Sequence, residues 1–323
     1  MIVGHQKQFQ FLEAAREGGR LSHAHIFSGP AKIGKKRFAL DWLSQILGAA
    51  LGEGTAYADF SFVAPLVDQK TGKLAEEITV DQIRGLIKKL SLTAAMGTYK
   101  AAIIDDAELM NGEAQNCLLK TLEEPPGDAL IILITRNSQR LLETIRSRAE
   151  ILQFNFATDK EMGKFVKVYI AENNIKIDEA EISEIVKLSF GRPGRLADFL
   201  RDPVGLKKWQ AAAKEFAQII AAELPEKFAY AKKITDSENP EMNLNEIMEI
   251  WQFHFRNLLL ERLNVAGVQP PQINDDKMRG LDPRKAVPEK ISGILKKIHE
   301  LSVVLQTTNA NPRLAVESFM LDL

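Results

Sequence analysis

A phosphate-binding loop is the first feature with recognisable chemistry. Residues 29–36 read Gly-Pro-Ala-Lys-Ile-Gly-Lys-Lys, which matches the spacing G-x-x-x-x-G-K between an apolar run and a helical pattern. In such loops, backbone N–H groups and the helix dipole attract phosphate oxygens, and Lys35 can reach the β- and γ-phosphates. Gly29, Gly34 and Lys35 are therefore candidate nucleotide-binding residues. A glycine-rich turn with a few lysines is the alternative.

The last position of this loop departs from the motif. Ser or Thr is expected where this chain has Lys36, because a hydroxyl there ligates Mg²⁺. An ammonium has no lone pair for a metal. If Lys36 pointed inward, it would repel a Mg²⁺ about 5 Å away by roughly 6–7 kcal/mol at an effective dielectric near 20. We therefore expect the loop to bind ATP or ADP weakly or not at all.

Two adjacent acids follow the next apolar run. Asp105 and Asp106 come directly after residues 101–104. In an ATPase, one acid at this place holds Mg²⁺ through water and the next polarises the attacking water. Asp106 is shorter than the Glu usual in the second role. The alternative, which Lys36 favours, is that these acids only end a buried strand at the surface.

An arginine-rich stretch lies between residues 136 and 148, where four arginines face a single acid, Glu143. A guanidinium at a domain edge can enter a neighbouring subunit's active site and stabilise charge on a transferring phosphoryl group. Such a contact changes the rate by ~10³–10⁵. Ser147 and Arg148 lie directly before a predicted strand, which makes them candidates for this role. A solvated charged face is the alternative.

Apolar runs and helical patterns alternate in the first half of the chain. This interleaving, with strands that are almost wholly apolar, is typical of a parallel sheet covered by helices on both faces. Asn111 is the expected N-cap of one helix, and Pro125 and Pro126 end it. The expected strands are residues 24–27, 101–104, 129–134 and 151–154, and the expected helices include 112–124.

After Phe156 the strand-like runs give way to helical periodicity. Thr158 and Glu161 form a capping-box signature at the start of one helix. A stretch with four prolines, residues 265–288, is expected to be a loop between helices. The predicted fold is an α/β domain at 1–156, a small helical domain at 157–202 and an all-α domain at 203–323.

Composition excludes several classes of protein. The chain has 323 residues, of which 45% are hydrophobic, so it can bury a substantial core. Its formal net charge of −1 excludes a globally basic nucleic-acid binder. The single cysteine, Cys117, supports neither a disulfide framework nor a cysteine-based zinc site. No apolar run resembles a signal peptide or approaches the ~20 residues of a membrane span, so we expect a cytoplasmic protein.

Several longer stretches carry a resemblance to a known family. The chain resembles the delta-prime subunits of bacterial DNA polymerase III clamp loaders, which are AAA+ proteins. The similarity extends over nearly the whole chain, and its central block is specific to clamp-loader subunits. The matching stretches are HAHIFSGPAKIGKKRFAL at 23–40, ITVDQIRGL at 78–86, YKAAIIDDAELMNGEAQNCLLKTLEEPPGDALIILIT at 99–135, LLETIRSRAEILQF at 141–154, GRPGRLADFL at 191–200 and NANPRLAVESFM at 309–320.

The resemblance implies a P-loop module, a helical lid and a helical collar that joins other subunits. Delta-prime subunits usually do not hydrolyse ATP and instead donate an arginine finger from a Ser-Arg-Cys motif. Ser147 and Arg148 match this motif, with Ala149 in place of Cys. Thr135 or Asn137 resembles the polar sensor position, and the second sensor arginine has its counterpart in Arg195, which opens a lid helix.

The resemblance also implies cofactors. The nucleotide would be Mg-ATP in a neighbouring subunit, with none belonging to this chain. Many family members carry a four-cysteine zinc module, but the corresponding stretch here, residues 48–62, has no cysteine. We therefore expect no zinc and no other metal.

The implied function is that of a non-hydrolysing subunit of the DNA polymerase III clamp loader, associated with the replisome and nucleoid. It would be a subunit of a DNA-directed DNA polymerase holoenzyme, a nucleotidyltransferase by association, without ATPase activity of its own. Implied partners are the delta subunit, the gamma/tau ATPase subunits, the sliding clamp and primer–template DNA; Arg84, Lys88 and Lys89 are candidates to face DNA phosphates. Two alternatives stay open: an active ATP-hydrolysing motor subunit, and a DNA-binding adaptor outside a clamp loader.

Overall fold

The computed structural model describes residues 3–66, 75, 77–236, 242–263, 287–308 and 310–323. The chain divides into two compact units, Met1–Leu200 and Arg201–Leu323. The first unit contains the α/β region and the first set of helices after it. The second unit is all-helical in its described residues. The predicted division of the first unit at residue 156 stays a prediction.

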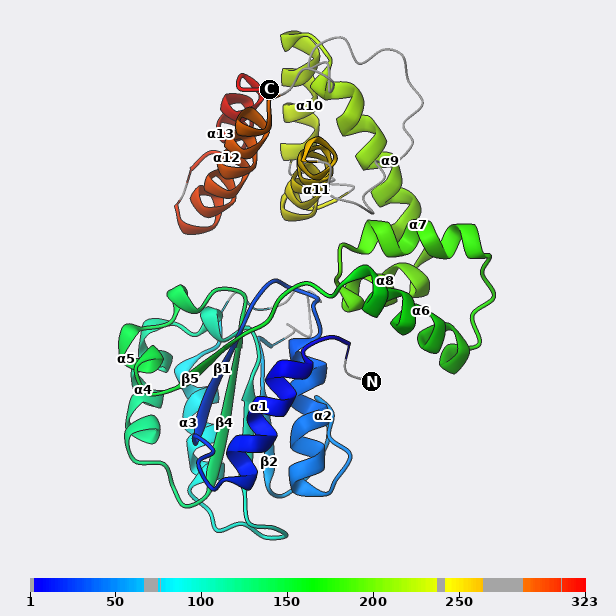
Figure 1. Cartoon of the computed structure of the whole chain (residues 1–323). Helices are drawn as coiled ribbons and strands as arrows, with labels where there is room; N and C mark the ends of the chain where they lie inside the picture. Colours follow the sequence, from blue (N-terminus) through cyan, green and yellow to red (C-terminus); the bar gives the residue numbers. More distant parts are fainter. Residues whose placement is uncertain (1–2, 67–74, 76, 237–241, 264–286, 309) are drawn as a thin grey trace. The chain divides into compact units, whose positions relative to one another are not determined.

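A five-stranded parallel sheet forms the centre of the first unit (Figure 1). Its strand order is β2-β3-β4-β1-β5, so β1 lies between β4 and β5 although it comes first in the chain. The three central strands, β3, β4 and β1, are buried at every position because both faces of the sheet are covered. Their bounds are β1 Ala24–Ser28, β2 Phe60–Val63, β3 Lys100–Ile104, β4 Ala129–Thr135 and β5 Glu150–Gln153.

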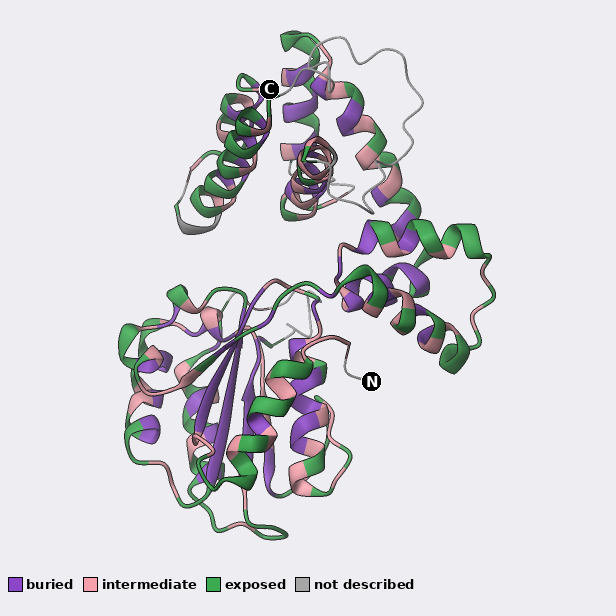
Figure 2. Cartoon of the chain, in the orientation of Figure 1, coloured by how far each residue is buried: buried purple, intermediate pink, exposed green. Residues whose placement is uncertain are grey.

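Helices cover the two faces of this sheet, and each face has its own core. On one face, alternate strand residues such as Phe27 and Ile132 pack with α1 and α2 around the buried Trp42. On the other, Ile26 and Ile131 pack with α3 and α4. Figure 2 shows the strands as a buried layer between them. The helices are α1 Gln6–Glu17, α2 Lys35–Leu47, α3 Val80–Leu90, α4 Gly112–Glu123 and α5 Glu143–Arg146.

Three helices complete the first unit. They are α6 Asp159–Asn173, α7 Glu179–Ser189 and α8 Pro193–Arg201. The predicted capping box opens α6: the Thr158 hydroxyl accepts from the Glu161 N–H, and the Glu161 carboxylate accepts from the Thr158 N–H. Asn111 likewise caps α4, since its side chain accepts from the Ala114 N–H.

The second unit packs its helices around a separate core. Trp251 is completely buried there and stacks between Phe216 and Phe319, with ring centroids 5.2 and 5.1 Å away. Tyr230 closes this core, and the Trp251 indole N–H donates to its hydroxyl. The helices are α9 Pro203–Ile220, α10 Leu224–Thr235, α11 Leu244–Arg262, α12 Pro288–Thr307 and α13 Pro312–Met320.

The structure confirms the four predicted strands and adds one. The sequence analysis missed β2, which has four residues and is only partly buried but pairs with β3 along its whole length. Most of the predicted loop at 265–288 lies outside the described residues. Within the residues that the structure describes, no helix has the length and apolar character needed to cross a bilayer.

Candidate functional site

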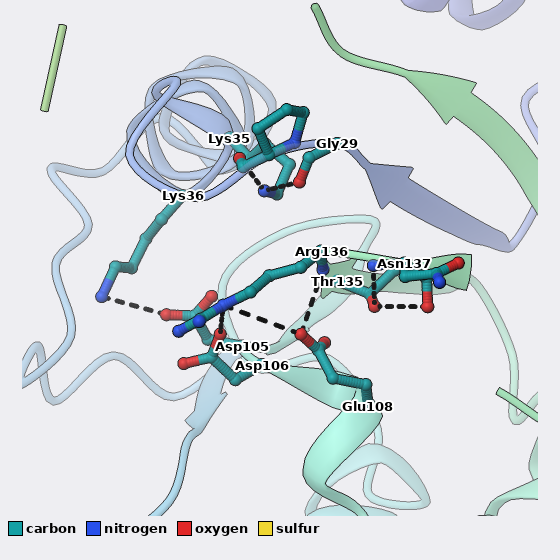
Figure 3. Close-up of polar contacts among 10 residues, drawn as sticks. Gly29, Lys35, Lys36, Asp105, Asp106, Glu108, Thr135, Arg136 and Asn137 are labelled. Carbon is teal, nitrogen blue, oxygen red and sulfur yellow. Dashed lines mark hydrogen bonds and ion pairs between the residues drawn. The ribbon is translucent and has the colours of Figure 1, made fainter. Parts of the chain in front are cut away.

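The phosphate loop connects β1 to α2, as predicted, and its lysine is turned inward. Lys35 is 7% exposed, and its ammonium donates to the carbonyl oxygens of Gly29 and Pro30 at 2.5 and 2.7 Å (Figure 3). Burial lowers the pKa of Lys35 to about 8. Gly34 has a positive φ of 101° at the helix start, a conformation that glycine adopts without strain. The loop therefore satisfies its lysine with its own carbonyl groups.

Lys36 lies between two carboxylates. Its ammonium is 3.0 Å from Asp105 Oδ2 at the end of β3 and 2.8 Å from Glu53 Oε1. Burial by itself would lower the pKa of Lys36, but the carboxylates of Glu53 and Asp105 have the larger combined effect. The pKa of Lys36 is therefore raised above its ordinary value. Burial also raises the pKa of Asp105, whose side chain is 12% exposed. Lys36, whose side chain is 40% exposed, therefore extends toward Asp105 and places a protein cation on the first of the two acids.

The second acid is engaged by an arginine. Asp106 adopts a left-handed backbone conformation, with φ of 48°, and its Oδ1 lies 3.5 Å from Nε of Arg136. Arg136, which follows β4, also donates its backbone N–H to the buried carboxylate of Glu108 at 3.1 Å. Figure 3 shows the contacts of Arg136 with Asp106 and Glu108. Both acids at the end of β3 thus have a cationic partner from the chain itself.

The two candidate sensor residues have different environments. Thr135 is buried at the end of β4, where its hydroxyl donates to the Asn137 carbonyl and accepts from the Asn137 N–H, both at 3.1 Å. These bonds close a local turn. Arg195 is 6% exposed within α8. The sensor roles of both residues stay predictions.

The start of α8 contacts the phosphate loop directly. The Gly194 N–H donates to the Lys32 carbonyl at 2.9 Å, and the Lys32 ammonium pairs with Asp198 at 3.0 Å. A Cβ added at Gly194 would lie 2.9 Å from the same carbonyl oxygen, so only glycine allows this approach. The helices after the sheet are therefore attached to the loop by a direct backbone contact.

Arg148 lies apart from this group, between α5 and β5. Its Nη2 pairs with Glu123 Oε1 at 2.6 Å, and its Nη1 donates to the Thr144 carbonyl at 3.0 Å. The Ser147 hydroxyl donates to the same carbonyl at 3.1 Å. The Arg148 side chain remains 34% exposed. The guanidinium is thus held in place and open to solvent.

The structure brings most of the candidates into one group and leaves one pair separate. Gly29, Gly34, Lys35 and Lys36 lie near Asp105, Asp106 and Thr135, whereas Ser147 and Arg148 do not belong to that group. Sequence reasoning missed the partners that complete these contacts, which are Glu53, Glu108, Arg136 and Glu123. Arg136 lies in the arginine-rich stretch and Glu123 in the predicted helix 112–124. No sequence pattern marked a loop acid such as Glu53 as a partner of Lys36.

Comparison with known proteins finds similarity to DNA polymerase III subunits. Residues 4–158, just under half of the chain, match a family model described as "DNA polymerase III, delta subunit". The DNA polymerase III subunit delta' of Pseudomonas aeruginosa is 39% identical over 147 residues, which are 41% of this chain and 43% of that protein. This N-terminal region is therefore similar to the delta-prime subunits of DNA polymerase III. The match thus spans less than half the length of that relative.

More distant relatives extend over more of the chain. The DNA polymerase III subunit tau of Bacillus subtilis is 27% identical and covers 93% of this chain and 57% of its own length. A solved gamma subunit-related protein from Thermotoga maritima is 20% identical, covering 96% of this chain and 97% of its own with a TM-score of 0.47. The structure itself confirms the predicted α/β class, with a parallel sheet, a phosphate-loop sequence between β1 and α2, and helices after the sheet.

The expected absence of zinc stays a prediction. Among the residues that the structure describes, no three His, Cys, Asp or Glu side chains are grouped so that they could hold a metal ion. Cys117 is partly buried on α4 and packs against the core on that face of the sheet. A structural role explains this position.

Proposed function

We propose that this chain is the delta-prime subunit of a DNA polymerase III clamp loader, the assembly that places a sliding clamp on primed DNA. In this proposal the chain does not hydrolyse ATP and instead donates Arg148 to the ATP of a neighbouring subunit. The similarity of residues 4–158 to DNA polymerase III delta and delta-prime subunits supports the clamp-loader role. The ion pair of Lys36 with Asp105 is the observation that carries the non-hydrolysing role.

Mg-ATP does not fit the chain's own loop. A hydroxyl after the loop lysine and an available carboxylate after the next strand are what such a site offers Mg²⁺. Lys36 has no lone pair, and its ammonium already engages Asp105. Lys35 is bonded to its own loop. Nucleotide binding would have to break these contacts, so we expect it to be weak at most.

Arg148 is suited to act on a different nucleotide. Arginine keeps its charge at any physiological pH and can bind phosphate oxygens through two N–H groups. In the neighbour, water attacks the γ-phosphorus and the bond from it to the β,γ-bridging oxygen breaks, yielding ADP, phosphate and a proton. The guanidinium would stabilise the negative charge on the transferring group. An exposed, fixed position is what this role requires, and Arg148 has both properties.

The partners follow from this role. They are the delta subunit, the gamma/tau ATPase subunits and, through the assembly, the sliding clamp and primer–template DNA, all in the cytoplasm. Arg84, Lys88 and Lys89 are exposed on α3, where they could contact DNA phosphates. Arg84 is paired with Asp81 at 3.2 Å, an exposed contact that phosphate can replace.

An ATPase measurement on the reconstituted clamp loader tests the proposal. The Arg148→Ala variant should assemble normally and should lower the rate constant at the one site it serves by ~10³ or more. The DNA-stimulated ATPase rate of the whole complex should fall by the fraction that this one ATP site contributes. The rate of clamp loading should fall as well. Failure of the variant to assemble, or an unchanged rate, would show that Arg148 is not an arginine finger.

An active motor subunit is the second candidate. The loop with Lys35 is complete apart from position 36, and the similarity to a tau subunit covers most of the chain. This candidate predicts that the isolated chain hydrolyses ATP when DNA is added and that Lys35→Ala abolishes the activity. Our proposal predicts no turnover from the isolated chain.

A further inference from the structure

Arg148 is held by groups from two different helices. Thr144 belongs to α5, whereas Glu123 is the last residue of α4. Their contacts fix both terminal nitrogens of the guanidinium, Nη1 through the Thr144 carbonyl and Nη2 through the Glu123 carboxylate. Two anchors on separate nitrogens define the plane of the group as well as its position.

The backbone beneath Arg148 is fixed as well. Ile145 is completely buried in the core, and the Arg148 N–H donates to its carbonyl at 3.1 Å. The Ser147 N–H donates to the Glu143 carbonyl at 2.9 Å, and β5 begins at Glu150. The side chain therefore projects from a rigid turn, and Glu123 is the charged group that holds its tip.

Helix stability does not explain a glutamate at this position. A helix C-terminus carries partial negative charge, so an acid in the last turn of α4 is disfavoured by the helix dipole. The Arg148 cation offsets this cost by lying next to Glu123 at 2.6 Å. The pairing accounts for a residue that α4 alone would not favour.

We propose that Glu123 is a positioning residue for Arg148, orienting the guanidinium toward the triphosphate of the neighbouring subunit. Glu123 holds Nη2, and Nη1 is held by the Thr144 carbonyl and the Ser147 hydroxyl, so the Nε–H and the second N–H of Nη2 are the groups that would meet phosphate oxygens. This inference rests on the proposed function, because it requires that Arg148 act in trans. Preorganisation of this kind lowers the entropy lost when the guanidinium meets the phosphate.

The experiment uses the reconstituted clamp loader and the Arg148-dependent rate, which is the share of the DNA-stimulated ATPase rate that Arg148→Ala removes. Glu123→Ala should lower the Arg148-dependent rate by about two- to fivefold, as expected for losing one exposed ion pair. Assembly and the KM for ATP should not change. Glu123→Gln keeps a hydrogen-bond acceptor for Nη2, so the Arg148-dependent rate should fall less than in Glu123→Ala. Glu124→Ala, an exchange of the adjacent exposed acid, is the matched control and should behave as wild type.

Two further readouts separate positioning from a general structural effect. In the Arg148→Ala background, Glu123→Ala should cause no further fall in the total DNA-stimulated ATPase rate, because the two residues act as a pair. The difference between wild type and Glu123→Ala should shrink as salt is raised, since exposed charges are screened.

Three results would overturn the inference: an unchanged or increased rate in Glu123→Ala, an equal loss in both backgrounds, or a difference that salt does not reduce. If Arg148→Ala itself leaves the rate unchanged, the proposed function fails and the inference fails with it. That outcome differs from one in which Arg148→Ala lowers the rate and Glu123→Ala does not.

Discussion

Individual residues decide what the loop can do. Lys35 and Lys36 are neighbours in the chain but have different partners, since one bonds to carbonyl oxygens of its own loop and the other to carboxylates. The positive charges near Asp105 and Asp106 are thus supplied by the protein. In a working site of this kind, Mg²⁺ arrives with the nucleotide and is held near these acids. Here Lys36 and Arg136 already place positive charge there, and their repulsion of Mg²⁺ is the physical reason to expect little Mg²⁺-dependent chemistry.

Replacing Lys36 should restore metal-dependent binding. Lys36→Thr removes the ammonium from Asp105 and supplies the missing hydroxyl. We expect calorimetry to give at least tenfold tighter Mg-ATP binding than in the wild type, a change of about 1.4 kcal/mol. Lys36→Met, which removes the charge without adding a ligand, should gain less. Equal affinities for the wild type and Lys36→Thr would contradict our assignment of Lys36 as the blocking residue.

A buried histidine should make the first unit sensitive to acid. His25 is completely buried on β1, and burial lowers its pKa from 6.5 to about 4. Between these two values the unfolded chain binds a proton on this ring but the folded chain does not. The free energy of unfolding should therefore fall by about 3 kcal/mol from this residue as pH drops from 6.5 to 4.

Urea denaturation at several pH values measures this effect. His25→Leu replaces the imidazole with an apolar side chain of similar size. The free energy of unfolding of this variant should depend less on pH between 6.5 and 4. His254, whose pKa burial also lowers to about 4, lies in the second unit and should retain its own contribution in this variant. A pH dependence identical to that of the wild type would mean that His25 does not titrate differently on folding.

At the scale of elements, the contact between α8 and the phosphate loop matters most. The family resemblance implies a lid helix opened by Arg195, but nothing in the sequence states where that helix packs. The structure shows the Gly194 N–H at the Lys32 carbonyl. The position of α8 is thereby tied to the loop conformation.

Two glycine substitutions test this contact. Gly194→Ala would crowd the Lys32 carbonyl and should destabilise the first unit by about 1–3 kcal/mol. Gly163→Ala is the matched control: Gly163 lies inside α6 with open space where a Cβ would be, and this change should stabilise by about 0.5–1 kcal/mol. Thermal unfolding measures both. A neutral or stabilising Gly194→Ala would show that the close approach is not required.

The whole molecule consists of two units with separate cores. The core of the second unit centres on Trp251, whereas the first has one core on each face of its sheet. The proposed function gives these units different tasks, namely a nucleotide-binding fold with Arg148 and a collar that joins other subunits. Separate cores allow each unit to keep its structure when the other is perturbed.

A cavity in the second core tests this independence. Trp251→Ala should cost about 3–5 kcal/mol, because it removes a completely buried aromatic side chain. Hydrogen exchange should show lost protection in α9–α13 and unchanged protection in β1, β3 and β4. Val204→Ala, a change at a 64% exposed position of α9, should stay within about 0.5 kcal/mol of the wild type. Equal loss of protection in both units would mean that they unfold as one.

The sequence by itself determined the elements and the chemistry of single positions. Apolar runs predicted four of the strands, local side-chain patterns predicted the caps at Asn111 and Thr158, and Lys36 stood out as a residue that cannot ligate Mg²⁺. Each of these depends on neighbouring residues, because periodicity and capping act within a few positions of the chain. For the same reason β2 was missed: it is four residues long and interrupted by Ser61, and its pairing with β3 defines it.

Only the tertiary structure decided which side chains meet. The pairs of Lys36 with Glu53, Arg136 with Asp106 and Arg148 with Glu123 join residues from different elements. Their distances follow from the order of strands in the sheet and the packing of helices on it, which no local pattern encodes. Charge signs in the sequence indicate that such pairs can form, but folding selects one partner among many acids of equal charge.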